Sequence, residues 1–217
     1  MKASTERKDW EKLQRRNRIV DFAQEIFFSK GYDGATMPGI AESAGYNKRT
    51  MYLYFKDKKE IFLAVVLRGY QELYSKLKQN SSNLMKTDSA FKKYAEAFFD
   101  FAVNNPGYLD LMMIYESRNY VYYGEPKENE NEHAAACQKI NEDIVELLTD
   151  SLQKGINDKR IRANLTPRQL LLMLWGQVFG VIQIMRIREQ YFEKTFEIKR
   201  EEFFSRFVEM VDGMLSS

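Results

Sequence analysis

Two adjacent cations, Lys48 and Arg49, are the side chains that the folding of a small domain least requires. Lysine and arginine can donate hydrogen bonds to O6 and N7 of guanine in the major groove of DNA, and the amide of the preceding Asn47 can pair with adenine. Thr50 and Tyr52 follow on the same polar segment. This combination of residue types indicates the direct reading of base edges.

The flanking sequence predicts two short helices that would position this segment. Thr36 can cap a first helix with its hydroxyl, and Gly45 can end that helix in a tight turn. Asn47 can cap a second helix, whose inner face Met51 and Phe55 would bury. A helix this short is stable only when it packs against its neighbours. We therefore predict a helix-turn-helix. Its recognition segment runs from Asn47 to Tyr54.

The basic residues gather toward the N-terminal end of the chain. Of the 217 residues, 44% are hydrophobic and 29% are charged, a composition typical of folded globular proteins. Residues 1–60 hold thirteen Lys or Arg against nine Asp or Glu, whereas the remainder holds twenty against twenty-two. The modest positive excess coincides with the cation pair, and it favours a polyanionic partner such as nucleic acid.

His133 and Cys137 are the only histidine and the only cysteine in the sequence. A single cysteine cannot form an internal disulfide, and one residue of each type supplies no metal-ligand set. We therefore expect no metal and no cofactor, and a reducing cytoplasmic location. A catalytic relay through His133 is an open alternative, but an exposed residue at the start of a helix is the favoured interpretation.

Apolar residues recur at helical spacing along the chain, so the predicted fold class is all-α, with about nine helices. One apolar stripe runs from Trp10 and Leu13 to Phe27, in a helix that should end at Lys30 because Gly31 follows. A second apolar stripe and the later helices are expected at residues 61–77, 88–104, 107–120, 132–156, 167–190 and 199–215.

A long helix is expected to be shared by two domains. Residues 1–57 would form the three-helix, helix-turn-helix DNA-binding domain, and residues 58–217 a larger helical domain for effector binding and dimerisation. Turn formers and charges predict loops over Gln79–Asp88 and Tyr123–Glu132. The longest apolar run, Leu170–Gly180, is too short to span a bilayer, and the charged N-terminus does not resemble a signal peptide.

The N-terminal third of the sequence closely resembles the tetracycline-repressor (TetR) family of transcriptional regulators. The matching elements are an aromatic-rich helix end, a T-x-x-x-I-A-x-x-A-G helix and a K-x-T-x-Y-x-Y-F-x-x-K pattern. They correspond here to Phe27–Tyr32, Thr36–Gly45 and Lys48–Ile61, with no insertion between them. The resemblance spans about residues 15–66, and so many matched positions make it specific.

The resemblance implies two classes of DNA contact. Phosphate contacts are implied for Thr36, Tyr54 and Lys58. Base or near-base contacts are implied for Tyr46, Asn47, Lys48, Arg49, Thr50 and Tyr52. Two residues depart from the family pattern. Many members carry a small residue where Arg49 stands, so a guanine contact here would be distinctive. Gly39 replaces a polar residue, and it either permits close approach to DNA or is a tolerated weakness in the helix.

Past residue 66 the resemblance fades, and the expectation of an effector site depends on composition. Aromatic residues and methionines are dense over residues 91–123 and again over 172–185. These side chains adapt to irregular apolar ligands, although ordinary core packing is the alternative for each one. The candidate pocket residues are Phe98, Phe101, Tyr108, Met112, Tyr115, Trp175 and Phe179. The candidate polar anchors are Asn104, Tyr115, Arg118 and Gln177.

The last two expected helices predict a homodimer. The helix that begins after Thr166 is apolar around most of its circumference, so its own domain can cover one side and a second subunit the other. The candidate interface residues are Gly176, Gly180, Phe203, Phe207 and Met210. A two-fold dimer fits a palindromic operator with half-sites about one helical turn, ~34–36 Å, or slightly more apart.

Together these features predict a ligand-responsive transcriptional regulator, most simply a repressor, that binds double-stranded operator DNA as a homodimer. A small apolar or aromatic effector would release it from DNA, and no membrane partner is expected. Two alternatives stay open. One is a helical protein-interaction module without specific DNA binding. The other is an enzyme acting on a hydrophobic substrate, although the sequence shows neither a nucleophile elbow nor a phosphate-cradling loop.

Overall fold

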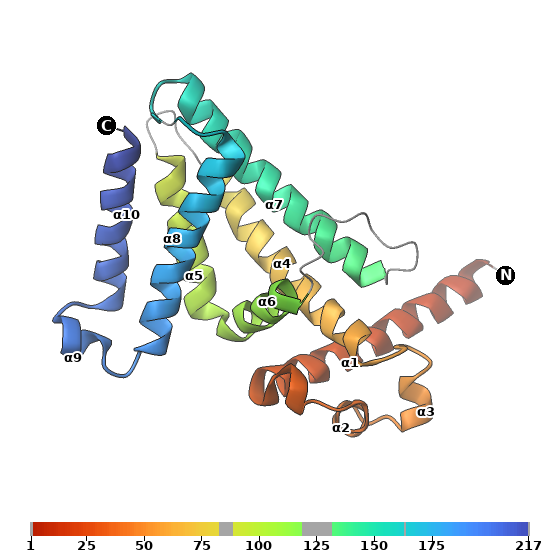
Figure 1. The fold of residues 1–217 in the computed structure, drawn as a ribbon. Helices are drawn as coiled ribbons and strands as arrows, with labels where there is room; N and C mark the ends of the chain where they lie inside the picture. The colour runs from red at the N-terminus through yellow and green to blue at the C-terminus, as the bar shows by residue number, and fades with distance from the viewer. Residues whose placement is uncertain (1, 83–88, 119–131, 163, 217) are drawn as a thin grey trace. The chain divides into compact units, whose positions relative to one another are not determined.

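The computed structural model describes residues 2–82, 89–118, 132–162 and 164–216. Over these ranges the chain forms ten helices and no strand, which confirms the all-α prediction (Figure 1). The helices are α1 (Lys2–Gly34), α2 (Met37–Ser43), α3 (Lys48–Met51), α4 (Lys58–Ser82), α5 (Ala90–Asn104), α6 (Pro106–Arg118), α7 (Glu132–Asn157), α8 (Pro167–Ile187), α9 (Phe192–Phe196) and α10 (Arg200–Ser216).

The chain divides into two compact units. Unit 1 comprises residues 1–71 and 105–140, and unit 2 comprises residues 72–104 and 141–217. Helices α4 and α7 therefore each begin in unit 1 and end in unit 2. The functional division at residue 58 stays a prediction, because the compact units are defined by packing and not by function.

Unit 1 is built on α1, which packs against α2 and α6. Ile19 and Phe27 on α1 are fully buried, as the apolar stripe predicts. Trp10 is 62% exposed and Leu13 is also exposed, which corrects their assignment to the same core stripe. These two residues have helical spacing, but they lie toward the N-terminal end of α1, which begins at Lys2. The main helical segment of α1 ends at Lys30, as predicted, because Gly31 adopts a left-handed φ of +69°; a short second segment continues to Gly34.

In unit 2 the helices α5, α8 and α10 pack against one another. Ring contacts hold the three together: Phe98 lies 4.5 Å from Trp175, and Phe99 stacks at 4.3 Å on Phe204. Short α9, which the sequence did not predict, follows α8, with Phe192 buried against Phe203.

Two expected boundaries change. Helix α4 continues through Ser82, so the segment from Gln79 to Ser82 is helical and not a loop as expected. Apart from Glu132, which begins α7, the remaining parts of the two expected loops lie outside the described residues. The helix expected over 167–190 ends at Ile187.

Helix α8 is long and apolar enough to cross a membrane by length and composition alone. It qualifies by its mean hydropathy over 18 residues, whereas its longest apolar run, Leu170–Gly180, is too short to span a bilayer. About 28% of its most apolar window is buried within the chain. The helix therefore presents a large apolar surface that its own fold does not cover.

Candidate nucleic-acid interface

Helix α2 begins with the cap that the sequence predicts. The Thr36 hydroxyl accepts a hydrogen bond of 3.2 Å from the backbone N–H of Gly39, and Pro38 stands in the first turn. A Cβ at position 39 would lie 3.1 Å from the Thr36 Oγ1, so glycine leaves room for this bond. The Thr36 hydroxyl is exposed and can still donate its own hydrogen, as the predicted phosphate contact requires.

A tight turn connects α2 to α3. Gly45 adopts a φ of +74°, a left-handed conformation that favours glycine. The Asn47 Oδ1 then accepts a 2.8 Å bond from the Thr50 N–H, which confirms the predicted cap of α3. Met51 and Phe55 are buried, so one side of this four-residue helix is fixed by packing, as predicted.

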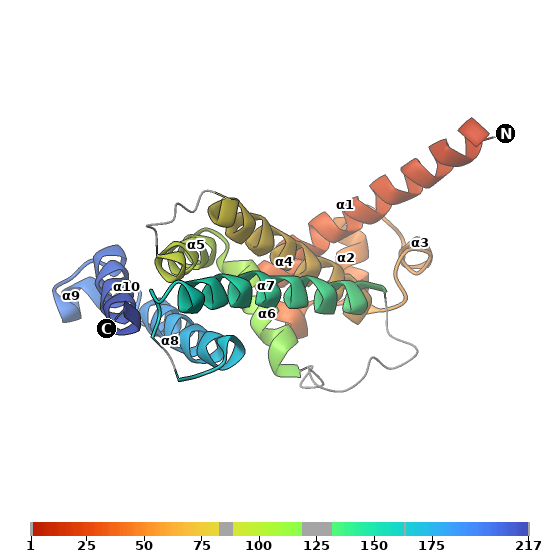
Figure 2. The same ribbon diagram turned by 90° about the horizontal axis from the view of Figure 1, so that it is seen from above.

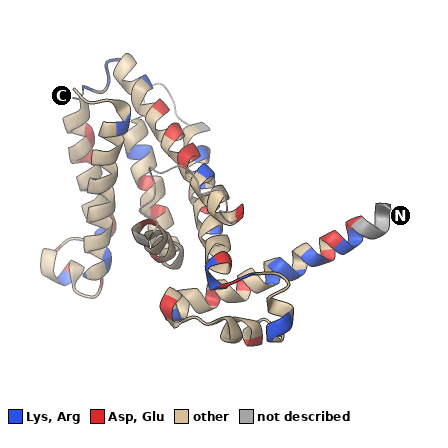
Figure 3. Ribbon diagram, turned by 45° about the vertical axis from the view of Figure 1, so that its right-hand side comes forward, with Lys and Arg blue, Asp and Glu red and all other residues tan. Residues whose placement is uncertain are grey.

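The opposite side of α3 carries the candidate reading residues. Lys48, Arg49 and Tyr52 are exposed there, and Thr50 is half-buried. α3 stands at the edge of unit 1 in both views of the ribbon (Figures 1 and 2), and Lys and Arg colour part of it blue, whereas blue and red segments alternate along α1 (Figure 3). The structure thus leaves the two cations accessible to a ligand.

Two tyrosines flank this surface. The rings of Tyr46 and Tyr54 lie 6.5 Å apart, and both side chains are half-buried. The contact fixes the orientation of Tyr54, whose phenol group is the predicted phosphate donor. Tyr54 therefore has a packing role, and its phosphate contact stays a prediction.

Lys58 differs from the other cations of this region because its charge is already used by the fold. Its ammonium group donates hydrogen bonds of 2.8 and 2.9 Å to the backbone carbonyls of Tyr32 and Ala35, and it lies 4.3 Å from the centroid of the Tyr32 ring. Two of its three hydrogens are thus committed near the end of α1. A phosphate contact from Lys58 would use the third.

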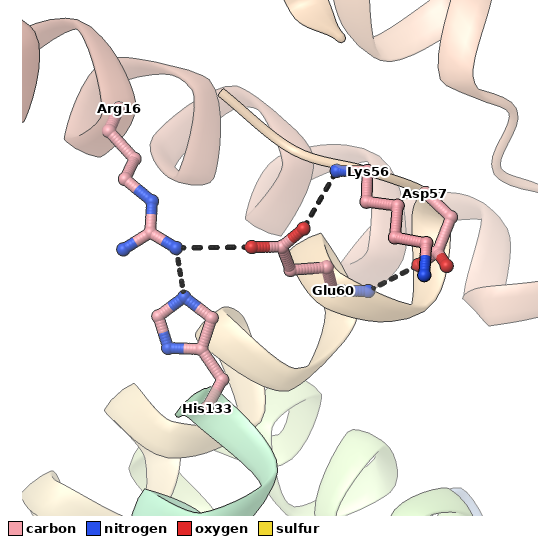
Figure 4. A network of polar contacts seen from close by, with 5 residues as sticks. All are labelled: Arg16, Lys56, Asp57, Glu60 and His133. Carbon is pink, nitrogen blue, oxygen red and sulfur yellow. Dashed lines mark hydrogen bonds and ion pairs between the residues drawn. The ribbon is translucent and has the colours of Figure 1, made fainter. Parts of the chain in front are cut away.

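A polar network within unit 1 joins α1, α4 and α7 (Figure 4). The Arg16 guanidinium bonds the Glu60 carboxylate at 3.3 Å and the His133 Nε2 at 2.7 Å. The other oxygen of Glu60 accepts a 2.7 Å bond from the backbone N–H of Lys56. The network therefore holds the segment that follows α3 against the start of α4.

The position of His133 corrects the sequence interpretation of an exposed residue. His133 is half-buried, and its pKa is lowered, mainly by burial and then by the Arg16 charge, while Glu132 and Glu60 act in the opposite direction. Local sequence could not show this, because Arg16 lies 117 residues away along the chain.

Comparison with known proteins places this geometry in a family. Residues 19–65, which span the capped helices and the start of α4, match the model of bacterial regulatory proteins of the tetR family. Over 180 residues the chain is 25% identical to IcaR of Staphylococcus aureus, a negative transcriptional regulator of the biofilm operon, covering 77% of this chain and 89% of IcaR. The chain carries a TetR-family DNA-binding domain.

Other TetR-family relatives match a smaller part of their length. The chain is 35% identical over 88 residues to the transcriptional activator FasR of Mycolicibacterium smegmatis, covering 41% of this chain and 40% of FasR. The match to YobS of Bacillus subtilis covers 54% of that protein, so the chain aligns with about half the length of these two relatives.

Solved structures share the whole fold. FadR of Bacillus subtilis, whose structure is in complex with stearoyl-CoA, superposes with a TM-score of 0.64 at 17% identity, covering 92% of this chain and 97% of FadR. FadR of Bacillus halodurans, a fatty acid degradation regulator, gives 0.65 at 16% identity, covering 94% and 95%. At these identities the likeness concerns the fold alone.

Unit 2 contains a small apolar cavity of about 50 Å³ that is partly open to solvent. Helices α4, α5, α7 and α8 all contribute to its wall. The lining residues are Leu77, Ala90, Phe91, Tyr94, Ala95, Phe98, Leu148, Ser151, Leu152, Leu171, Leu174, Trp175 and Val178. Its aliphatic and aromatic composition suits an apolar ligand.

Of the predicted pocket residues, Phe98 and Trp175 line this cavity. Two others are close by in the fold of unit 2 but do not line it: Phe101 is fully buried, and Phe179 stacks on Trp175 at 6.2 Å. Among the candidate anchors, Asn104, Tyr115 and Gln177 do not line it, and the side chain of Arg118 lies outside the described residues.

The α6 candidates belong to unit 1 instead. Tyr108 and Met112 pack against Gly69 of α4, where a Cβ would lie 3.1 and 3.2 Å from their atoms. Tyr115 packs on Tyr70 at 6.1 Å. These side chains are therefore core residues between α4 and α6, because α6 presents its aromatic face to α4 and not to the cavity.

A second uncovered surface of unit 2 consists of apolar residues on α8 and α10. We call it the α8–α10 apolar face. Its exposed or open members are Leu172, Met173, Gly176, Gly180, Ile184, Ile187, Met210, Gly213 and Met214. Nothing lies within 4 Å of a Cβ built on any of its three glycines. The predicted interface residues Phe203 and Phe207 are half-buried at its edge.

Proposed function

We propose that this chain is a DNA-binding transcriptional repressor that works as a homodimer and is released from its operator by an apolar or aromatic effector. The observation that carries the DNA-binding part is the exposed pair Lys48 and Arg49 on a helix whose other side is buried. Among the residues that the structure describes, neither of these two charges has a hydrogen bond or ion pair, whereas Lys58 and Arg16 are bonded within unit 1.

Five of the six candidate base contacts, all except Asn47, keep the roles implied by the family resemblance. Lys48 and Arg49 would donate to guanine, and Tyr52 would pack along the bases. Asn47 would act mainly through the cap that orients α3, because its Oδ1 is already bonded to the Thr50 N–H. Thr36 and Tyr54 would donate to phosphates and fix the register.

The α8–α10 apolar face supports the homodimer. Leu172 is 72% exposed and Ile187 is 81% exposed, although both lie on a helix whose opposite side is buried. Uncovered apolar surface of this extent is unfavourable in water, and the open glycines would let a helix of a second copy approach closely. A two-fold pair would also supply the two reading heads that a palindromic operator needs.

The cavity supports the effector part of the proposal, together with the complex that FadR of Bacillus subtilis forms with stearoyl-CoA. Leu77 near the end of α4 lines the cavity, and α4 begins at Lys58 next to the recognition segment. A ligand that shifts α4 would thus move the recognition segments of the dimer and lower their affinity for DNA. By linkage, bound DNA would lower the affinity for the ligand by the same factor.

The proposal treats the protein as a binding protein and not as an enzyme. Burial raises the pKa of the Cys137 thiol to about 12, so this residue is a poor nucleophile. His133 is bonded to Arg16. In the part of the chain that the structure describes, no cluster of three His, Cys, Asp or Glu side chains could hold a metal. The TetR-family relatives are regulators, which agrees with a cytoplasmic location.

The decisive test replaces Lys48 and Arg49 with alanine and compares the variant with K56A/K59A. Both variants lose two positive charges near α3, but Lys56 and Lys59 are assigned to solvent. An operator would first be selected from random duplexes with the full-length protein. We expect K48A/R49A to lower operator affinity about a hundredfold, since each base contact is worth ~1–3 kcal/mol.

In the K56A/K59A variant, DNA affinity should fall only a few-fold, and by the same factor for operator and random duplex, because general electrostatic attraction does not depend on base sequence. Equal losses in the two variants would leave a non-specific polyanion binder, and no loss in either would favour the protein-interaction module. A fluorescence anisotropy titration at two salt concentrations separates these results.

A further inference from the structure

The cavity of unit 2 contains one pair of hydroxyl side chains in a wall that is otherwise apolar apart from the indole N–H of Trp175. The phenol oxygen of Tyr94 lies 2.9 Å from the Oγ of Ser151, and both residues line the cavity. Ser151 also lies 3.1 Å from the Leu147 carbonyl oxygen, to which its hydroxyl can donate. Every other lining side chain is aliphatic or aromatic, without a charge.

This wall disfavours the binding of a charged ligand group. Moving a carboxylate or phosphate from water into an apolar site is strongly unfavourable unless a cation or several donors receive it. No lysine, arginine or histidine is among the lining residues. A free acid would have to become protonated or keep its charge in the solvent, and either requirement weakens binding.

The same pair suits an uncharged oxygen. If the Ser151 hydroxyl donates to Leu147 and the Tyr94 hydroxyl donates to Ser151, the phenol oxygen retains lone pairs that can accept from a ligand hydroxyl. If Tyr94 turns its hydrogen toward the ligand, it can donate to a carbonyl. Tyr94 is only 7% exposed, so a ligand group that reaches this oxygen would meet little competing water.

We propose that the cavity selects a hydrocarbon ligand that carries one uncharged oxygen group, an alcohol, ester or thioester, opposite the Tyr94–Ser151 pair, and discriminates against free carboxylates. The proposal rests on the effector role proposed above, and it narrows the apolar or aromatic effector to a neutral one. Any charged portion of a larger ligand would stay outside the cavity.

Trp175 provides a direct probe, because it lines the cavity and the chain has only two tryptophans. In the full-length W10F variant, tryptophan fluorescence reports on Trp175 alone. The probes are 1-octanol, methyl octanoate, octanoate and butylbenzene, titrated at pH 7.5. We expect octanol and methyl octanoate to bind at least about tenfold more tightly than octanoate.

Two variants then test the polar pair. Y94F and S151A in the W10F background should weaken octanol about fivefold to tenfold, the effect of one lost hydrogen bond, and leave butylbenzene unchanged. Y74F is the matched control, since Tyr74 of α4 belongs to unit 2 but does not line the cavity. Equal weakening of octanol and butylbenzene by Y94F would mean a packing role and overturn the proposal.

Octanoate binding as tightly as octanol would also overturn it. Operator affinity is measured with the same protein and ligands. Neutral ligands that bind but leave operator affinity unchanged would support the ligand class and contradict the proposed effector role. Operator release by octanoate but not by octanol would support the effector role and contradict the ligand class.

Discussion

Helices α3 and α8 each bury one side against their own unit, but they leave opposite kinds of chemistry on the other side. α3 exposes Lys48 and Arg49, and α8 exposes Leu172 and Ile187. Water solvates exposed cations well, so α3 would be stable with or without its proposed partner, DNA. Exposed leucine and isoleucine side chains are poorly solvated, so α8 gains stability whenever they are covered. The difference indicates a reversible ligand surface on α3 and a lasting contact on α8.

The largest effect is expected from placing charge on the α8–α10 apolar face. In I184E/M210E, two copies would bury four unpaired carboxylates at a two-fold contact, each costing several kcal/mol, ~3–5. We expect the parent to sediment as a dimer at micromolar concentration and this variant as a monomer. Operator affinity should then fall by more than about a hundredfold, because the two heads are no longer linked.

The matched control for this experiment is Q153E/S205E, which adds the same charge at exposed positions outside the α8–α10 apolar face. It should remain a dimer. If I184E/M210E sediments like its parent, the apolar face has another partner, and the contrast between α3 and α8 must be explained without a homodimer.

A second prediction separates the two kinds of cation within unit 1. K58M keeps the length of the side chain but removes the donors to the carbonyls of residues 32 and 35. We expect the free energy of unfolding to fall by about 1–3 kcal/mol, because two buried acceptors lose a charged donor. K48A and R49A should change it by less than ~0.5 kcal/mol, as is usual at exposed sites. Urea unfolding measures all three.

The neighbouring variant K59M serves as the control, since Lys59 is exposed. Equal free energies of unfolding for K58M and K59M would contradict the structural role of Lys58. The predicted phosphate contact would then be the only role left for its ammonium group.

The helix-turn-helix could be predicted in detail, because the contacts that define it join residues close together in the sequence. Each predicted cap, from Thr36 or Asn47, bonds a backbone N–H three residues ahead, so the pattern is visible in a short window. Met51 and Phe55 were assigned to the core by helical spacing, and both are buried. The same spacing failed for Trp10, since periodicity shows which side a residue occupies but not whether anything covers that side.

The cavity could not be predicted at residue level because its determinants are distant in sequence. Tyr94 and Ser151 are 57 residues apart, and neither belonged to the candidate pocket. Aromatic content over residues 91–123 was informative for α5, whose Phe98 lines the cavity, and misleading for α6, whose Tyr108 packs on Gly69 in unit 1. Composition identifies apolar surface, but only the fold decides which neighbour it meets.

The smallest predicted effect concerns the polar network of Arg16, Glu60 and His133, which lies next to the segment that follows α3. The folded state lowers the pKa of His133 from its ordinary value of 6.5, so the neutral imidazole that accepts from Arg16 is the stable form. This stability is present above about pH 6.5 and is lost as the pH falls through the lower folded-state pKa. Because the side chain is partly exposed, we expect a loss of at most ~1 kcal/mol between pH 7.5 and 5.5.

H133Q should flatten this pH dependence, and since His133 is the only histidine, the difference between parent and variant isolates its titration. Glu116 acts in the opposite direction, because burial raises its pKa despite the hydrogen bond from Tyr70, so its protonation favours the folded state as the pH falls. Urea unfolding at four pH values, with E116Q measured in parallel, separates the two groups. An unchanged pH dependence in H133Q would show that the Arg16 contact adds nothing to the stability of unit 1, and α3 would then depend on apolar packing and its cap alone.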